Sequence, residues 1–204
     1  MKIKSSETKI PFLIVQDLYD EHELRMIKKE IDFIHSAGCF TSNTANTGSA
    51  IDGDGNILKK AKGIWLDNIY TDRNTSMILR LNRKPMHNKE IKQSFIDLNP
   101  YHNSYAWVNR DTSLLHYYEN GGAYKSHHDE TVFSCVTWFF NNPKKFKGGN
   151  LTFTDLNVSV EIEDNMCVIF PGMLRHEVEE IKMQEDINDE KNGRYSLAQF
   201  MLIG

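Results

Sequence analysis

Residues 113–140 read SLLHYYENGGAYKSHHDETVFSCVTWFF, and this stretch decides the fold class. Its two apolar runs, 113–118 and 132–140, are separated by Asn120-Gly121-Gly122 and a polar segment. Short runs rich in branched and aromatic residues, bounded by Asn and Gly, are typical of β-strands joined by turns. We therefore expect strands on both sides of the turn.

The same pattern continues to residue 203. Further short apolar or alternating runs occupy residues 151–153, 166–170, 177–181 and 195–203, and turn-forming residues stand between them. Several short strands at this spacing predict a β-sandwich or barrel. The hydrophilic stretch 182–193 is expected to be a surface loop between the last two strands.

Helices are predicted in the first half of the chain. Asp20 is a candidate N-cap with Glu23 three residues later, the arrangement known as a capping box. Apolar residues then recur at helical spacing as Leu24, Ile27, Ile31 and Ile34, and Gly38 is the expected stop.

Two shorter helices are predicted over 75–83 and 88–98, with Pro85 and Pro100 as breaks. A chain of 204 residues fits one domain. Within it, we expect a helical and loop region over 1–111 to support a β core over 112–204.

Residues 41–56 are rich in Thr, Ser, Asn, Asp and Gly and are expected to form a long loop, a candidate lid over a site. Asp52, Asp54 and Asn56 resemble the opening of a calcium-binding loop. Ile57 stands where such a loop needs glycine, however, and Gly63 stands where it needs glutamate. A turn is therefore favoured over a calcium site.

Composition argues against several classes of partner. The formal net charge is −4, which provides no basic surface for nucleic acid or an anionic membrane. No apolar run approaches the roughly 18 residues that span a bilayer, and the first residues lack an apolar signal region. Cys39, Cys135 and Cys167 lack the spacing of disulfide or metal sites and are expected to be reduced. The expectation is a cytoplasmic protein.

Residues 124–129, YKSHHD, contain the strongest candidate for a functional site. Because residues i and i+2 of a strand point to the same face, His127 and Asp129 can bind one ion while the histidine between them points away. Alone, His-x-Asp also fits a pair of surface residues. His176, which follows Phe170-Pro171-Gly172, would complete a set of two histidines and one carboxylate. Such a set leaves coordination positions open on iron for dioxygen chemistry.

Arg194 is a candidate for binding a distal carboxylate. A co-substrate 2-oxo acid with a second carboxylate needs a fixed cation deep in the barrel, and a guanidinium binds carboxylate through two parallel hydrogen bonds. Arg194 and Ser196 open the last predicted strand at i, i+2 spacing, so both side chains would face the same side. The alternative is an arginine in a surface ion pair.

Four blocks occur in a fixed order: Tyr118-x-x-Gly121-x-x-Tyr124-x-x-His127-x-Asp129, Gly148-Gly149-x-Leu151-x-Phe153, Phe170-Pro171-Gly172-x-x-x-His176 and Arg194-x-Ser196. Together they resemble the 2-oxoglutarate/Fe(II)-dependent dioxygenase superfamily, specifically its prolyl 4-hydroxylase-like branch. The resemblance covers roughly residues 113–203. It implies a mainly β fold with flanking helices, in which a double-stranded β-helix (jelly roll) is supported by N-terminal helices.

The resemblance also implies a role for each site residue. His127, Asp129 and His176 would bind Fe(II), Arg194 and Ser196 would hold the distal carboxylate of 2-oxoglutarate, Tyr118 would line the co-substrate pocket, and Tyr124 would lie nearer the substrate. The implied reaction consumes O2, hydroxylates a C–H bond and releases succinate and CO2, with ascorbate as a candidate reductant. Phe139 is a departure: it is the nearest match to a tyrosine that contacts the distal carboxylate in many prolyl hydroxylases, and it has no hydroxyl group.

The sequence is compatible with three functions. The first is a hydroxylase acting on a prolyl residue, another peptide or amino-acid residue, or a small molecule. The second, a nucleic-acid demethylase of the same superfamily, would carry a second arginine six residues after Arg194, where Phe200 stands. The third, a cupin-like metal-binding module without catalysis, would have no need of a buried Arg194.

Overall fold

Two antiparallel sheets face each other in the computed structural model, which describes residues 1–42, 47–183 and 190–204. The larger sheet contains β1 (Lys2–Ser5), β2 (Leu13–Gln16), β4 (Lys62–Trp65), β5 (Arg110–Tyr118), β7 (Phe133–Phe139), β11 (Met166–Pro171) and β14 (Arg194–Leu202). The smaller sheet contains β3 (Lys59–Lys60), β6 (Ala123–His127), β9 (Leu151–Phe153), β10 (Val158–Val160) and β12 (His176–Val178).

The strand orders are those of a double-stranded β-helix. The larger sheet runs β1-β2-β11-β7-β14-β5-β4 and the smaller runs β10-β9-β12-β6-β3, while β8 (Phe146–Lys147) pairs separately with β13 (Lys182–Met183). Strands account for 34% of the chain and helices for 26%, so the predicted mainly β class is confirmed. Each predicted run from residue 113 onward contains or overlaps a strand.

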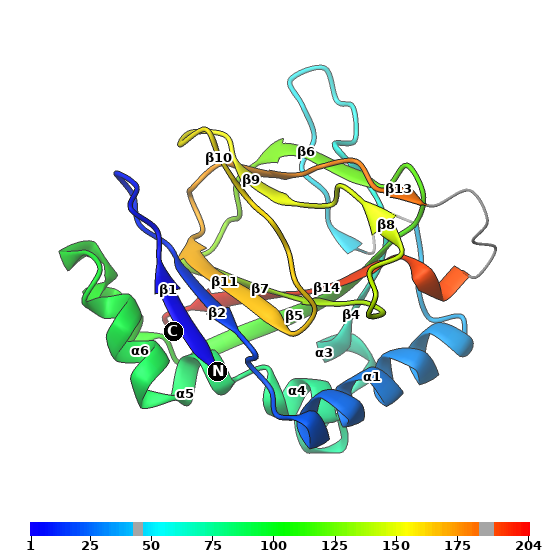
Figure 1. Cartoon of the computed structure of the whole chain (residues 1–204), viewed down its shortest axis with the longest axis horizontal. Helices are drawn as coiled ribbons and strands as arrows, with labels where there is room; N and C mark the ends of the chain where they lie inside the picture. The colour runs from blue at the N-terminus through cyan, green and yellow to red at the C-terminus, as the bar shows by residue number, and fades with distance from the viewer. Residues whose placement is uncertain (43–46, 184–189) are drawn as a thin grey trace.

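The helices cover the outer face of the larger sheet (Figure 1). They are α1 (Glu21–Ser36), α3 (Leu66–Ile69), α4 (Met77–Leu81), α5 (Lys84–His87) and α6 (Lys89–Ile96), with 3-10 turns η1 (Arg73–Thr75), η2 (Pro100–Trp107) and η3 (Glu190–Asn192). None of the described helices is long and apolar enough to cross a membrane.

The predicted capping box starts α1. The Asp20 carboxylate accepts from the Glu23 amide at 2.8 Å, and the Glu23 carboxylate accepts from the Asp20 amide at 3.0 Å. These two bonds satisfy backbone donors that the first helical turn leaves without partners. The helix ends before Gly38, whose φ of +68° is the left-handed conformation that glycine adopts easily.

Two cores follow from strand alternation. On β11, Cys167 and Ile169 face the helices, whereas Val168 and Phe170 face the space between the sheets. A strand buried on both faces carries a continuous apolar run, which explains the sequence MCVIFP. Cys135 is also buried on the helix side, and the cysteines are free thiols, as expected.

Several expectations for the first half of the chain need correction. Strands β1 to β4 lie before residue 111 and join both sheets, and the sequence did not indicate them because each has only two to four residues. Pro85 does not break a helix. It stands in the first turn of α5, where its missing N–H needs no acceptor.

The two predicted loops are only partly within the described residues. In the 41–56 loop, the Asp52 carboxylate accepts from the amides of Asp54 and Asn56, which confirms a turn there; residues 43–46 lie outside the described part. In the 182–193 segment, β13 pairs with β8, so its beginning is a strand and not a surface loop. Residues 184–189 lie outside the described part.

Asp111 connects the helical layer to β5. Its side chain is 0% exposed, and it accepts hydrogen bonds from Arg73 at 2.8 Å, Arg83 at 2.7 Å and Gln199 at 3.0 Å. Removing one member of a buried ionic network leaves the other charges uncompensated.

We expect Asp111→Ala to lower the free energy of unfolding by about 3 kcal/mol, measured by urea denaturation. Asp97→Ala is the matched control, because its exposed carboxylate accepts a surface hydrogen bond from Gln93, and it should leave the unfolding midpoint nearly unchanged. Equal midpoints for the Asp111 variant and the control would show that the network does not stabilise the fold.

Candidate functional site

The three predicted metal ligands lie together between the sheets. His127 ends β6 and His176 begins β12, and the two residues are direct partners in the antiparallel register. Asp129 follows two residues after β6. One ligand atom from each of the three lies within 4.8 Å of the others. Strand pairing thus brings together two histidines that are 49 residues apart in the sequence.

Hydrogen bonds fix which nitrogen of each histidine faces the shared space. Nδ1 of His127 lies 2.9 Å from the Lys125 carbonyl, and Nδ1 of His176 lies 2.9 Å from the Leu174 carbonyl. A carbonyl can only accept, so each Nδ1 carries the proton and each Nε2 keeps a free lone pair. Burial and the neighbouring His176 lower the pKa of His127 to about 3, which keeps the ring neutral.

The carboxylate completes the donor set. Asp129 Oδ1 lies 3.8 Å from His127 Nε2, and Asp129 Oδ2 lies 3.7 Å from His176 Nε2. These separations are too long for hydrogen bonds but suit an ion with bonds of about 2.0–2.2 Å to each atom. Ser134 on β7 donates to Asp129 Oδ2 at 2.5 Å and holds the carboxylate in place.

Aromatic rings enclose the histidines. Tyr124 stacks on His127 with ring centroids 3.6 Å apart and an angle of 15°. Phe170 meets His176 edge-on, with centroids 4.8 Å apart. These contacts restrict the rotamers of both imidazoles and keep water away from one side of the site.

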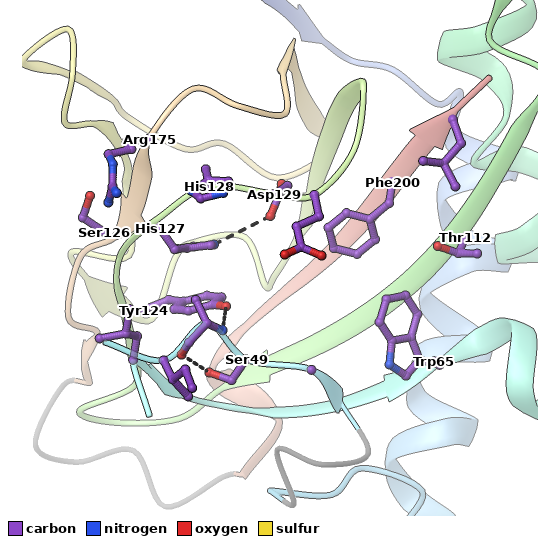
Figure 2. A pocket seen from close by; sticks show the side chains of 16 residues that line it. Ser49, Trp65, Thr112, Tyr124, Ser126, His127, His128, Asp129, Arg175 and Phe200 are labelled. Atoms are coloured by element: carbon purple, nitrogen blue, oxygen red, sulfur yellow. Dashed lines mark hydrogen bonds and ion pairs between the residues drawn. The ribbon is translucent and has the colours of Figure 1, made fainter. Parts of the chain in front are cut away.

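A pocket of about 640 Å³ opens in front of these residues. Figure 2 shows His127 and Asp129 pointing toward one another on one side of the pocket, with Trp65 and Phe200 on the other. The rings of Trp65 and Phe200 touch, with centroids 5.6 Å apart. His128 is exposed, as strand alternation predicts, and lies at the pocket wall.

Arg194 is buried behind the site and is not a surface ion pair. It is 1% exposed, and its strand β14 pairs with β5 so that Arg194 lies opposite Tyr118. The guanidinium carbon is 4.8 Å from the centroid of the Tyr118 ring. Burial lowers the pKa of Arg194 to about 10 but leaves it protonated. Ser196, 3% exposed, is two residues along the same strand and so faces the same side.

Phe139 does not face this region, so the expected match to a carboxylate-binding tyrosine is wrong by one residue. Phe139 packs on the helix side against Tyr19 and lies opposite Tyr195. Its neighbour Trp138, opposite Ser196, faces the space between the sheets. A shift of one residue along a strand moves a side chain to the other face.

Comparison with known proteins agrees with the geometry. The sequence model of the 2OG-Fe(II) oxygenase superfamily matches residues 113–202, the part of the chain that carries His127, Asp129, His176 and Arg194. This match, to a little under half of the chain, identifies a 2OG-Fe(II) oxygenase. The chain is an Fe(II)- and 2-oxoglutarate-dependent dioxygenase. No curated protein matches the sequence.

Solved structures share the fold of this oxygenase at low identity. A prolyl-4-hydroxylase from Pseudomonas putida is 15% identical with a TM-score of 0.64, covering 96% of this chain and 94% of that chain. A Trichoplax adhaerens prolyl hydroxylase, in complex with a hypoxia inducible factor peptide fragment, is 12% identical with a TM-score of 0.61, covering 94% and 83%. A viral collagen prolyl hydroxylase from Paramecium Bursaria Chlorella virus-1, in complex with 2OG, is 9% identical with a TM-score of 0.50, covering 93% and 94%.

The donors of the oxygenase fit both of its cofactors. Two imidazoles and a carboxylate suit Fe(II), because that metal accepts nitrogen and oxygen ligands on one face and keeps other positions open. The buried Arg194 guanidinium has two nitrogens, Nε and Nη1, with no hydrogen-bond partner among the described residues. A buried cation with free donors suits a carboxylate.

Lys59 is a site residue that the sequence did not indicate. Its amine is buried and donates to the carbonyls of Thr47 and Gly48 and to Nε2 of His116. Burial lowers the pKa of Lys59 to about 8, so the amine stays largely protonated at neutral pH. Burial and the charge of Lys59 hold the pKa of His116 well below its usual range, so the ring can accept this bond. Lys59 thereby fastens the loop whose residues 48–51 line the pocket.

We expect Ser134→Ala to weaken metal binding by about tenfold, because loss of an outer hydrogen bond to a ligand typically costs this much. Titration calorimetry with Mn(II) measures the effect. Ser159→Ala is the control, since its hydroxyl bonds Glu179 on the surface. Unchanged affinity in the Ser134 variant would remove its assigned role.

We expect Lys59→Met to loosen residues 47–51 and to raise amide exchange there by about tenfold, because charge-assisted hydrogen bonds to two carbonyls are lost. Hydrogen–deuterium exchange mass spectrometry measures this locally. Lys60→Met, a change at the exposed neighbouring residue, should leave the exchange as in the wild type. If both variants behave alike, Lys59 does not hold the loop.

Proposed function

We propose that this oxygenase hydroxylates a C–H bond of a peptide or amino-acid residue, with a prolyl residue as the first candidate. The observation that carries the proposal is the arrangement of a His-Asp-His set at the wall of a pocket of about 640 Å³, with a buried arginine behind it whose Nε and Nη1 atoms have no hydrogen-bond partner among the described residues. One side of the metal site thus accepts a substrate and the other accepts the co-substrate.

In this proposal, His127, Asp129 and His176 hold Fe(II). Bound Fe(II) and 2-oxoglutarate supply the oxidising chemistry, which consumes O2 and releases succinate and CO2. The hydrogen bonds to Lys125, Leu174 and Ser134 keep the three ligand atoms aimed at one point. A preorganised site of this kind needs little rearrangement when the ion enters.

Arg194, Ser196 and Tyr118 form the co-substrate side. Arg194 would bind the distal carboxylate through its free nitrogens, and Ser196 lies beside it on the same face of β14. Tyr118 is 2% exposed and covers the guanidinium with its ring. Burial raises the pKa of Tyr118 to about 12, so its hydroxyl keeps its proton and can donate.

The substrate side is formed by Tyr124, Trp65 and Phe200. The Tyr124 hydroxyl accepts from the Ala50 amide at 2.8 Å and so joins the 48–51 segment to the pocket wall. The two rings opposite His127 offer an apolar surface that suits a saturated ring or aliphatic side chain. Phe200 adds no charge for a nucleic-acid backbone, so a demethylase acting on nucleic acid is disfavoured.

We expect Asp129→Ala and His176→Ala each to abolish Fe(II)-dependent succinate formation and to weaken Mn(II) binding at least about a hundredfold, since each removes one of three protein ligands. The matched control is His128→Ala, which removes the histidine that stands between His127 and Asp129 in the sequence. This variant should still bind Mn(II). Metal binding that survives the Asp129 change would contradict the assigned site.

The substrate class is tested by a turnover screen. Purified enzyme with Fe(II), 2-oxoglutarate and ascorbate is offered proline-containing peptides, free amino acids, small metabolites and methylated oligonucleotides, and succinate is measured. We expect peptides or amino acids to stimulate succinate release and to gain one oxygen atom by mass spectrometry. Stimulation by methylated oligonucleotides alone would overturn the proposal.

A further inference from the structure

Two fully buried side chains, Arg194 and Trp138, carry hydrogen-bond donors that have no partner among the described residues. Arg194 is 1% exposed and Trp138 is 0% exposed. Within the described residues, neither the Nε and Nη1 atoms of Arg194 nor the indole Nε1 of Trp138 has a hydrogen-bond partner. A buried donor without an acceptor is costly, and natural folds rarely keep one without a reason.

The donors come from neighbouring strands and lie close together. Trp138 on β7 is the register partner of Ser196 on β14, and Arg194 is two residues before Ser196. The guanidinium carbon lies 5.7 Å from the centroid of the Trp138 ring and 4.8 Å from that of Tyr118. The rings of Trp138 and Tyr118 therefore both border the guanidinium.

Gly149 makes room for this arrangement. Its φ is +71°, and a Cβ atom there would lie 3.1 Å from Cδ of Arg194 and 3.1 Å from Ile181. The arginine side chain thus passes directly over the glycine backbone and is closed in from that side. Solvent cannot satisfy the free donors, because atoms of Arg194 and Trp138 are almost fully enclosed.

We propose that the indole N–H of Trp138 is a second donor to the distal carboxylate of the co-substrate, beside Arg194, and that it helps to set the selectivity for 2-oxoglutarate. The inference rests on the proposed co-substrate site and names a residue outside the four sequence blocks. In this proposal, the indole N–H of Trp138 supplies the donor that Phe139, which has no hydroxyl group, cannot supply.

The chemistry of the donors specifies the ligand. An indole N–H and a guanidinium donate only, and neither can accept a hydrogen bond. A carboxylate offers two accepting oxygens, whereas an amide tail offers one and would direct its own N–H groups at the other donor. The pair therefore favours a 2-oxo acid with a carboxylate tail over one with an amide tail, and over one whose tail has no polar group.

The first test compares three ligands by titration calorimetry on the full chain with Zn(II) at the metal site. They are 2-oxoglutarate, 2-oxoglutaramate, and 2-oxopentanoate, which has the same chain length without the distal carboxylate. We expect Trp138→Phe to raise the Kd for 2-oxoglutarate about tenfold, the typical effect of losing a hydrogen bond to a charged group. The Kd for 2-oxopentanoate should not change. Trp107→Phe, a change at a residue 68% exposed on η2, is the control and should alter neither.

The second test needs no change at Trp138 and so does not depend on the folding of a variant. The chain has three tryptophans, so indole ¹⁵N–¹H spectra of wild type, Trp65→Phe and Trp107→Phe identify the Trp138 signal by elimination. We expect that signal to move downfield when 2-oxoglutarate binds the Zn(II) protein and to move little with 2-oxopentanoate.

The outcomes separate this inference from the proposed function. Equal weakening of both ligands in Trp138→Phe, weakening of neither, or an unmoved indole signal with 2-oxoglutarate bound would overturn the role of Trp138 alone. Failure of the wild-type Zn(II) protein to bind 2-oxoglutarate at all would overturn the co-substrate site and this inference together.

Discussion

Antiparallel pairing of β6 with β12 is the constraint on which the site depends. It sets His127 opposite His176, although 49 residues separate them in the chain, and it leaves both Nδ1 atoms bonded to nearby carbonyls. The remaining nitrogens then face Asp129. Because a slip of one residue in this register would turn one histidine away, the whole ligand set relies on the hydrogen bonds of a short ladder.

The space between the sheets combines an apolar wall with a few costly polar groups. Phe153 and Phe170 pack beside His176, while Arg194 and Trp138 keep unpaired donors in the same interior. An interior chosen for stability alone would not bury a guanidinium without a counter-ion. In the proposed co-substrate site, these polar groups form half of a binding site that a ligand carboxylate completes.

Local patterns in the sequence predicted local structure well. The capping box of Asp20 and Glu23, the strand alternation that turns His128 outward and the apolar runs from residue 113 onward all depend on neighbours in the chain. The errors arose where a partner far along the chain decides the outcome. Strands β1 to β4 are too short to be recognised alone and form as parts of the two sheets, and Pro85 lies in the first turn of α5.

The sequence by itself determined which residue types could form the site, their order and their spacing, because His127, Asp129, His176 and Arg194 are read directly from the chain. Tertiary structure decided which side chains share the interior. It placed Trp138 there and Phe139 outside, brought Ser134 to Asp129, and set Lys59 against His116, 57 residues away. The direction of a side chain and its neighbours depend on strand register and on sheet stacking, which arise only when distant segments pack together. The site thus combines residues that the sequence identifies with neighbouring residues that come together only when the chain folds.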